Sequence, residues 1–125
     1  MTYGIVRLIE DLKILGFDEV TVIQDSGNTS YALIPNFEIL TGNFAGRIID
    51  LAIPAPPQYP QMFGASIHVR ATPHLVPFGP VPNLRNVIAS NLGAAWQYWS
   101  YCFNISPVNP TSELISQINE IFRRN

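Results

Sequence analysis

Cys102 is the side chain of this sequence with the greatest capacity for covalent chemistry. A cysteine thiolate is a strong nucleophile that forms reactive thioesters, provided that it is exposed and stabilised by a nearby cation or helix N-terminus. Trp99, Tyr101 and Phe103 surround Cys102 in the chain, and free cysteine is among the most often buried residue types. Two interpretations therefore stay open: an acyl-carrying nucleophile and a structural cysteine of the core.

Three polar residues in and after a proline-rich stretch add further candidates. The imidazole of His74 titrates near neutral pH and suits an acid or base, or it orients the loop by bonding a carbonyl group. Asn83 and Asn86 carry amides that can donate hydrogen bonds to an oxyanion. Capping a helix is an alternative role for Asn83.

Other familiar kinds of site are not visible in the sequence. Two histidines and one cysteine form no CxxC or HxxxH pattern, so we expect neither a zinc site nor another cofactor. There is no Ser-His-Asp spacing, glycine-rich phosphate loop or pair of carboxylates that would indicate catalysis. His68 and Arg70 alternate with apolar residues in a predicted strand, and we expect both to face solvent.

The composition indicates one folded domain over residues 1–125, with 47% hydrophobic and 13% charged residues. A formal charge of -2 argues against nucleic acid as a partner, because phosphate binding needs a basic face. No apolar run reaches the about 18 residues of a membrane helix, so we expect no membrane association and no signal peptide. A lone cysteine suits a reducing compartment, and we expect a cytoplasmic protein.

Apolar spacing predicts one N-terminal helix followed by four strands. The residues of one helical face are Ile5, Leu8, Ile9 and Leu12. Gly16 suits the end of this helix, because glycine adopts the left-handed conformation at low cost. The predicted strands are 20–24, 31–39, 48–53 and 66–70. Short turn signals between them are typical of an antiparallel meander.

Helices are expected after a loop at 72–83, where four prolines exclude a helix or a central strand. The apolar residues that next fall on one helical stripe are Leu84, Val87, Ile88, Leu92, Ala95, Trp96, Trp99 and Phe103. A last helix begins at Asn109-Pro110 and ends in Arg123 and Arg124. The sequence thus predicts an α+β domain with an N-terminal helix, a four-stranded antiparallel meander and C-terminal helices.

Two segments resemble the ubiquitin-conjugating (UBC-like) superfamily. Residues 37–60 are similar to the family segment in which an aromatic-Gly turn precedes a strand that ends in Phe-Pro and then Tyr-Pro. Here Asn43-Phe44-Ala45-Gly46 corresponds to the turn, Ile53-Pro54 to the strand end and Tyr59-Pro60 to the Tyr-Pro pair. Residues 92–100 resemble the Leu-Gly-x-x-Trp-Gln-x-Trp-Ser run of a divergent bacterial branch.

The resemblance implies a UBC-like fold, with a ubiquitin-like protein and its activating enzyme as partners. On a first hypothesis the chain carries the ubiquitin-like protein on Cys102 as a thioester and passes it to an amine. His74, Asn83 and Asn86 would then be loop auxiliaries, although His74 is followed by Leu75 and no His-Pro-Asn triplet is present. On a second hypothesis the chain is a non-catalytic module that holds a ubiquitin-like protein or a conjugating enzyme.

Aromatic residues are the candidates for contact with such a partner, because tyrosine and tryptophan anchor many interfaces. The partner-binding candidates are Tyr59, Phe78, Tyr98 and Tyr101. Trp96 and Trp99 are expected in the core, which is the usual place for two tryptophans at this spacing. Exposure of Cys102 would separate the two hypotheses, since a buried thiol cannot carry the thioester.

Overall fold

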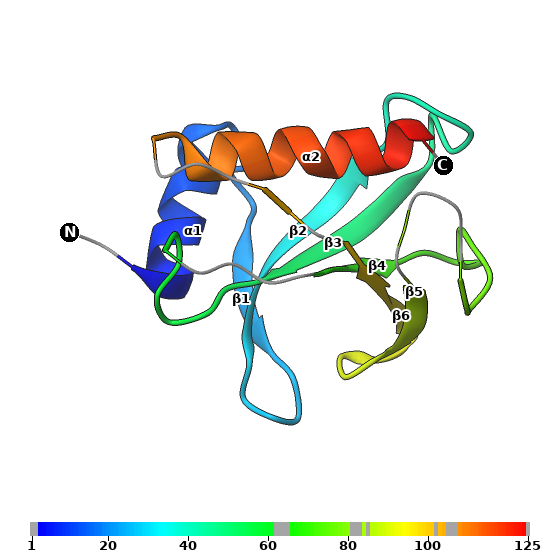
Figure 1. Cartoon of the computed structure of the whole chain (residues 1–125), viewed down its shortest axis with the longest axis horizontal. Coiled ribbons are helices and arrows are strands. Elements are labelled where there is room, and N and C mark those ends of the chain that lie inside the picture. Colours follow the sequence, from blue (N-terminus) through cyan, green and yellow to red (C-terminus); the bar gives the residue numbers. More distant parts are fainter. Residues whose placement is uncertain are drawn as a thin grey trace.

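A computed structural model describes residues 3–61, 66–80, 84, 86–101, 103–104 and 108–124 of the chain (Figure 1). Within these residues two helices enclose six strands in sequence. The elements are α1 (Gly4–Ile14), β1 (Thr21–Gln24), β2 (Ser30–Glu38), β3 (Ile48–Pro54), β4 (Ser66–Arg70), β5 (Asn86–Ser90), β6 (Gly93–Ser100) and α2 (Pro110–Arg124).

The six strands form one antiparallel sheet with the order β1-β2-β3-β4-β6-β5. After β4 the chain crosses to the outer edge of the sheet and forms β5. A tight turn then returns β6 into the position beside β4, in a register that runs from Ser66↔Ser100 to Arg70↔Trp96. The β5–β6 hairpin therefore extends the meander β1–β4 by two strands.

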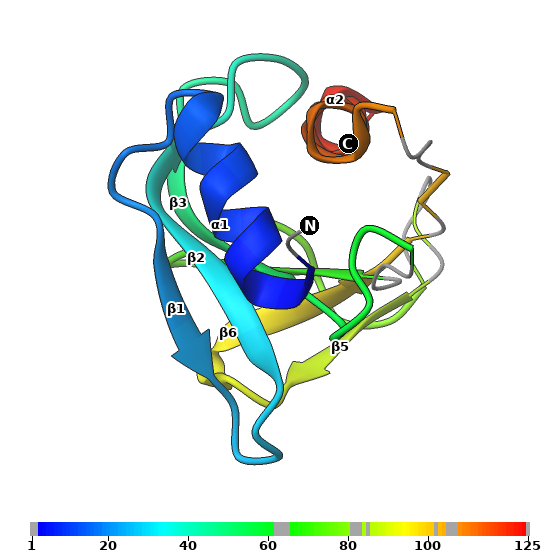
Figure 2. The ribbon, with the colours of Figure 1, turned by 90° about the vertical axis from the view of Figure 1, so that its left-hand side faces the viewer.

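Both helices lie on the same side of the curved sheet, as Figure 2 shows. Leu8 and Leu12 of α1 are 0% exposed, and α2 contributes Ile118 and Phe122 to the same core. The ring of Phe122 lies 5.6 Å from that of Trp99 in β6, measured between centroids. The opposite face of the sheet carries no helix among the described residues, and we call it the uncovered face.

The N-terminal half follows the expectation from sequence. The predicted helix and all four predicted strands are present, and Gly16, two residues after the end of α1, has a left-handed φ of 103°. Ile67 and Val69 of β4 point into the core, whereas His68 and Arg70 lie on the uncovered face. The last helix is also confirmed, and it begins at Pro110 as the sequence predicts.

The predicted fold is nevertheless wrong in its second half. The sheet has six strands instead of a four-stranded meander, and the stripe from Leu84 to Phe103 contains β5 and β6 instead of a helix. One described helix, not several, follows the strands. The chain is α+β, but it does not show the series of four strands followed by helices that the UBC-like resemblance implied.

The error has a physical cause, because the β5–β6 hairpin carries apolar side chains on both of its faces. Val87 and Trp99 are 0% exposed beneath the helices, while Ile88 and Trp96 lie on the uncovered face. With both faces apolar, the two-residue alternation of a strand disappears and the spacing imitates a helix. Trp96 and Trp99 are both buried as expected, but on opposite faces of the sheet.

The turn between β2 and β3 packs closely against the end of α2. Gly42 in this turn has a φ of 83°, and a Cβ atom at this position would overlap the carbonyl oxygen of Phe122. Gly46 in the same turn has a φ of 91°, but a Cβ atom there would meet no atom within 4 Å. Substitutions at the two glycines therefore distinguish the effect of backbone strain from the effect of overlap with α2.

We predict that Gly42→Ala lowers the free energy of unfolding by about 2–4 kcal/mol, because strain and overlap with α2 add together. Gly46→Ala is the matched control and should cost about 1–2 kcal/mol, from the left-handed conformation alone. Urea denaturation followed by circular dichroism measures both. Equal losses of unfolding free energy in the two variants would show that overlap with α2 does not contribute.

Candidate functional site

His74 and Phe78 lie together in the loop after β4. Their rings meet edge to face, with centroids 5.5 Å apart. Nδ1 of His74 is buried and has no hydrogen-bond partner among the described residues, whereas Phe78 is 53% exposed. Two backbone hydrogen bonds join Gly79 of this loop to Val87, so the loop is attached to β5.

The predicted catalytic group is described only in part. Asn86 is exposed at the start of β5, and its Oδ1 accepts a hydrogen bond of 3.0 Å from the N–H of Val87. His74 belongs to the loop attached to that strand. Cys102 and Asn83 lie outside the described residues. The catalytic roles of these four residues therefore stay predictions.

Tyr59 is placed in the core, although we expected it at a partner surface. Its side chain is 1% exposed, and its hydroxyl lies 2.6 Å from Oγ1 of Thr111 at the start of α2. Thr111 donates its own proton to Asp11 Oδ2 over 2.7 Å, so Tyr59 must donate to Thr111. Burial raises the pKa of Tyr59 to about 12, and the hydroxyl stays protonated at neutral pH.

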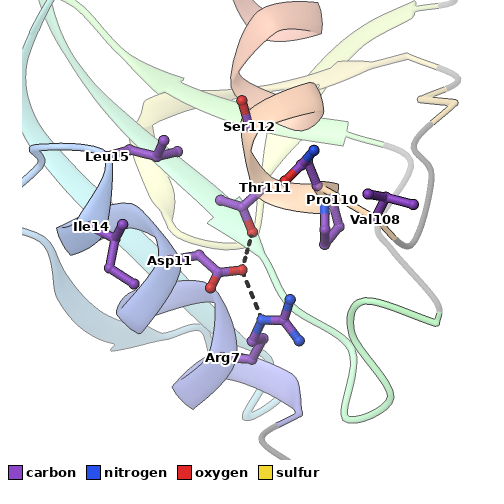
Figure 3. Close-up of a pocket in the computed structure, with 9 residues that line it drawn as sticks. Arg7, Asp11, Ile14, Leu15, Val108, Pro110, Thr111 and Ser112 are labelled. Carbon is purple, nitrogen blue, oxygen red and sulfur yellow. Dashed lines mark hydrogen bonds and ion pairs between the residues drawn. The ribbon is translucent and has the colours of Figure 1, made fainter.

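A cavity of about 140 Å³ lies beside this network, between the end of α1 and the start of α2 (Figure 3). Arg7 and Thr111 approach Asp11 from the two helices, and both bond to its Oδ2 atom. The apolar rim is exposed, with Ile14 at 83% and Val108 at 79%. Because the carboxylate already has two partners, the polar groups of this cavity serve mainly to join the helices.

The other two aromatic candidates lie in and just after β6. Tyr101 is half-buried, and its ring contacts Phe103 at a centroid distance of 5.0 Å. Tyr98 is also half-buried, but it stands on the uncovered face of the sheet next to His68 of β4. Among the predicted partner-binding residues, Phe78 is thus exposed and Tyr59 is buried. Tyr98 and Tyr101 are both half-buried.

The uncovered face is hollow beside His68. Small side chains contribute to this part of the face, with Ser66 two residues before His68 in β4 and Ala89 in β5. Tyr31 and Tyr98 rise on either side, and each meets the imidazole of His68 edge-on, at centroid distances of 4.8 Å and 5.2 Å. The resulting cavity has a volume of about 330 Å³, and His68, Tyr31 and Tyr98 belong to its lining.

His68 is buried, which corrects the expectation that it faces solvent. Its side chain is 3% exposed, and its Nδ1 lies 2.7 Å from Oγ of Ser90 in β5. The other ring nitrogen, Nε2, makes no hydrogen bond to a described residue. Burial lowers the pKa of His68 to about 4 and outweighs the opposite effect of Asp25, so the imidazole is neutral at physiological pH.

Charged groups lie at the borders of the uncovered face. At one border Tyr31 donates a hydrogen bond of 2.8 Å to Asp25. Burial and this bond raise the pKa of Tyr31, and the same bond lowers the pKa of Asp25. At the other border Arg70 bonds Asp50 at 2.7 Å and places its guanidinium 4.7 Å from the ring centroid of Trp96. These contacts leave the centre of the face uncharged.

A serine bonded to a histidine can act as a nucleophile with its base. The hydrogen bonds of Ser90 and His68 indicate a structural role instead. Oγ of Ser90 also accepts a hydrogen bond of 3.0 Å from the N–H of Leu92, and Ser90 is not part of the cavity lining. An imidazole with a pKa near 4 is a weak base at neutral pH. The arrangement suits binding of an uncharged group better than acyl transfer.

No family model, no curated protein and no solved structure matches this chain. None of the described helices is long and apolar enough to cross a membrane. The described residues also contain no group of three or more histidine, cysteine, aspartate or glutamate residues that could hold a metal ion.

Sequence reasoning missed that His68 and Tyr31 line one cavity and that Ser90 bonds to His68. The alternation of apolar and polar residues in β4 correctly predicted that His68 lies on the outward face. It could not show that two tyrosines from other strands cover the imidazole. A usable signal was present in the small residue Ser66 of β4, since a small side chain on a sheet face leaves space between larger neighbours.

We predict that the protein loses about 2–3 kcal/mol of stability through His68 as the pH falls from about 6.5 to about 4. In this window the unfolded chain binds a proton at His68 and the folded protein does not, so acid favours unfolding. Urea denaturation at a series of pH values tests this, with His68→Gln as the variant that removes the titration. Parallel pH profiles for the two proteins would contradict the prediction.

Proposed function

We propose that this chain is a binding module that holds a protein partner on the uncovered face of its sheet and does not itself carry out a reaction. The observation that carries the proposal is the uncharged cavity of about 330 Å³ at the centre of this face. Ile88 borders it and is 46% exposed. Pockets that accept a buried anchor residue supply most of the binding energy at protein interfaces.

The proposed partner class, a ubiquitin-like protein or a conjugating enzyme, follows from the resemblance. Residues 92–100 carry its most specific part, and they contain the whole of β6. This strand supplies Trp96 and Tyr98 to the uncovered face. The loop with Phe78 is bonded to β5, the strand of Ile88, so the sheet face and the proline-rich loop are joined. The proposal includes a cytoplasmic location, which the lone cysteine favours.

The alternative, thioester formation on Cys102, stays a prediction from sequence. The uncovered face gives it no support, because the polar pairs there connect structural elements and the imidazole of His68 is a weak base. A binding module needs no nucleophile. The two functions therefore differ in one measurable respect, the requirement for the thiol of Cys102.

We predict that unlabelled ubiquitin, used as a probe of the partner class, shifts amide NMR signals of Ile88, Tyr98 and neighbouring residues of the uncovered face. Ile88→Asp should weaken this binding by about 10- to 30-fold, since a charge replaces an apolar contact at the cavity border. Val6→Asp is the matched control, because Val6 is 56% exposed on α1, on the other side of the sheet. It should leave the affinity unchanged.

The absence of shifts with ubiquitin at millimolar concentration would contradict the proposed partner class. Shifts confined to α1 and α2, or equal losses in the Ile88→Asp and Val6→Asp variants, would contradict the proposed surface. Circular dichroism spectra of both variants establish that each is folded before the titrations are compared.

We predict that Cys102→Ala binds ubiquitin with a dissociation constant within about twofold of the unmodified protein, because binding does not need the thiol. Incubation with an activating enzyme, ATP and ubiquitin should yield no adduct that a reducing agent releases. An adduct that forms on the unmodified protein and is missing from Cys102→Ala would contradict the binding-module proposal and favour the thioester hypothesis. Non-reducing gel electrophoresis distinguishes the outcomes.

A further inference from the structure

β1 forms an outer edge of the sheet, at the margin of the molecule in Figure 2. The strand pairs with β2 on one side, and no described strand pairs with its other side. The opposite edge of the sheet is different, because two hydrogen bonds between Gly79 and Val87 attach a loop to β5. Among the described strands, β1 therefore has the edge that is open to an additional strand.

The hydrogen-bond pattern shows which backbone groups this edge presents. Just after β1, the N–H of Asp25 donates a bond of 3.2 Å to the carbonyl group of Thr29. Bonded and non-bonded positions alternate along an antiparallel pair, so Val22 and Gln24 direct their N–H and C=O groups away from β2. Ser30, opposite Gln24, fits this alternation, since its carbonyl group accepts a bond of 3.1 Å from the chain after β3. The edge thus presents two donors and two acceptors at the spacing that another strand needs.

β1 lacks the residues with which sheet edges commonly exclude added strands. Its sequence, Thr21-Val22-Ile23-Gln24, contains no lysine, proline or glycine. The register shift of this part of the sheet lies in β2 between Ile34 and Phe37, beyond the residues that pair with β1. Val22 is 50% exposed and offers apolar contact to a neighbouring strand.

The charge around β1 is acidic. Asp18 and Glu19 are exposed just before β1, and neither forms an ion pair with a described residue. Asp25 follows β1, and the hydrogen bond from Tyr31 lowers its pKa, so this carboxylate is ionised at neutral pH. Residues 14–46 contain no lysine or arginine at all, and their charged residues are Asp18, Glu19, Asp25 and Glu38. A strand with a basic residue at each end therefore complements this edge.

A cavity of about 320 Å³ lies at the beginning of β1. Val20 and Ile34, which lie just beyond the first pair of β1 and β2, belong to its lining together with Asp18 and Glu19. Apolar walls beside carboxylates suit a lysine or arginine side chain, which buries its methylene groups and keeps its charge near acidic groups. The cavity thus favours a basic residue at one end of an added strand.

The same charges disfavour a second copy of this chain at the edge. Antiparallel pairing of two β1 strands through Val22 and Gln24 would place the beginning of one strand beside the end of the other. Asp18 and Glu19 of one chain would then approach Asp25 of the other, and like charges at neighbouring positions of a sheet repel. The edge therefore discriminates between its own copy and a basic strand.

We propose that the open edge of β1 binds an extended peptide segment of a protein partner, with a basic residue at each end, as a seventh strand of the sheet. The segment pairs with the backbone groups of Val22 and Gln24, and one basic side chain enters the cavity beside Asp18 and Glu19. This cavity shares no lining residue with the cavity beside His68, so the inference goes beyond the proposed function and does not rest on it.

The test titrates three synthetic peptides into the ¹⁵N-labelled full chain. The basic peptide is acetyl-Lys-Val-Thr-Val-Thr-Lys-amide, the acidic peptide has glutamate at both ends, and the proline peptide keeps both lysines but has proline at the four central positions. We expect the basic peptide to shift the amide signals of Val22 and Gln24. At saturation it should slow their hydrogen exchange at least about fivefold, because both N–H groups gain a partner. The acidic and proline peptides should each bind at least about tenfold more weakly.

Two changes to the chain test the backbone and the charge separately. Val22→Pro removes an outward donor without breaking a bond to β2, and it should weaken binding of the basic peptide at least about tenfold. Asp18→Asn combined with Glu19→Gln leaves the backbone intact and should weaken binding about five- to tenfold. Glu10→Gln is the matched control, because it removes a charge from an exposed position of α1. It should leave the dissociation constant within about twofold.

Equal binding of the basic and proline peptides would overturn strand addition, because charge alone would then explain the affinity. Equal binding of the basic and acidic peptides would overturn the assignment of a basic segment. A dimer in analytical ultracentrifugation that Val22→Pro dissociates would make a second copy the occupant and overturn the proposal.

Absence of shifts at Val22 and Gln24 with every peptide would overturn the inference, even where ubiquitin shifts signals of Ile88 and Tyr98. Shifts and slowed exchange at Val22 and Gln24 support it even where ubiquitin does not bind, and the proposed partner class then fails alone. Because Asp18 and Glu19 are exposed, the charge variant decides the result without Val22→Pro.

Discussion

The antiparallel pairing of β4 with β6 is the interaction on which the rest of this structure depends. It brings Trp99 beneath α2, where its ring contacts Phe122, and it sets Tyr98 beside His68 on the other face. The same register places Trp96 opposite Arg70, whose guanidinium lies over the indole ring. One pairing therefore completes the hydrophobic core and forms the aromatic wall of the cavity.

The two faces of the sheet are stabilised in different ways. The helix-covered face is a continuous apolar core, and the network from Tyr59 through Thr111 to Asp11 joins it to both helices. The uncovered face has paired charged side chains at its borders, and an uncharged hollow lies between them beside His68. Such a surface offers a partner apolar area without an unpaired charge, which favours binding.

The cavity beside His68 and the predicted catalytic group are made of different residues. His68 is neutral and bonded to Ser90, so it positions and binds more readily than it transfers protons. His74 and Phe78 lie in the loop that is bonded to β5, where an exposed aromatic ring can extend a contact surface. The proposed binding module uses the cavity and this loop and does not require the thiol of Cys102.

The sequence by itself determined the two terminal helices and the first four strands, because their apolar residues recur with clear local periods and are bounded by turn residues. It also assigned His68 and Arg70 to one face of β4. Only the tertiary structure decided that residues 86–100 form a hairpin, since a strand edge at β4 and burial on both faces outweigh the helical spacing of Val87, Trp96 and Trp99. The tertiary structure likewise decided that His68 is buried, because the tyrosines that cover it come from β2 and β6. Contacts between such distant segments leave no local pattern in a sequence.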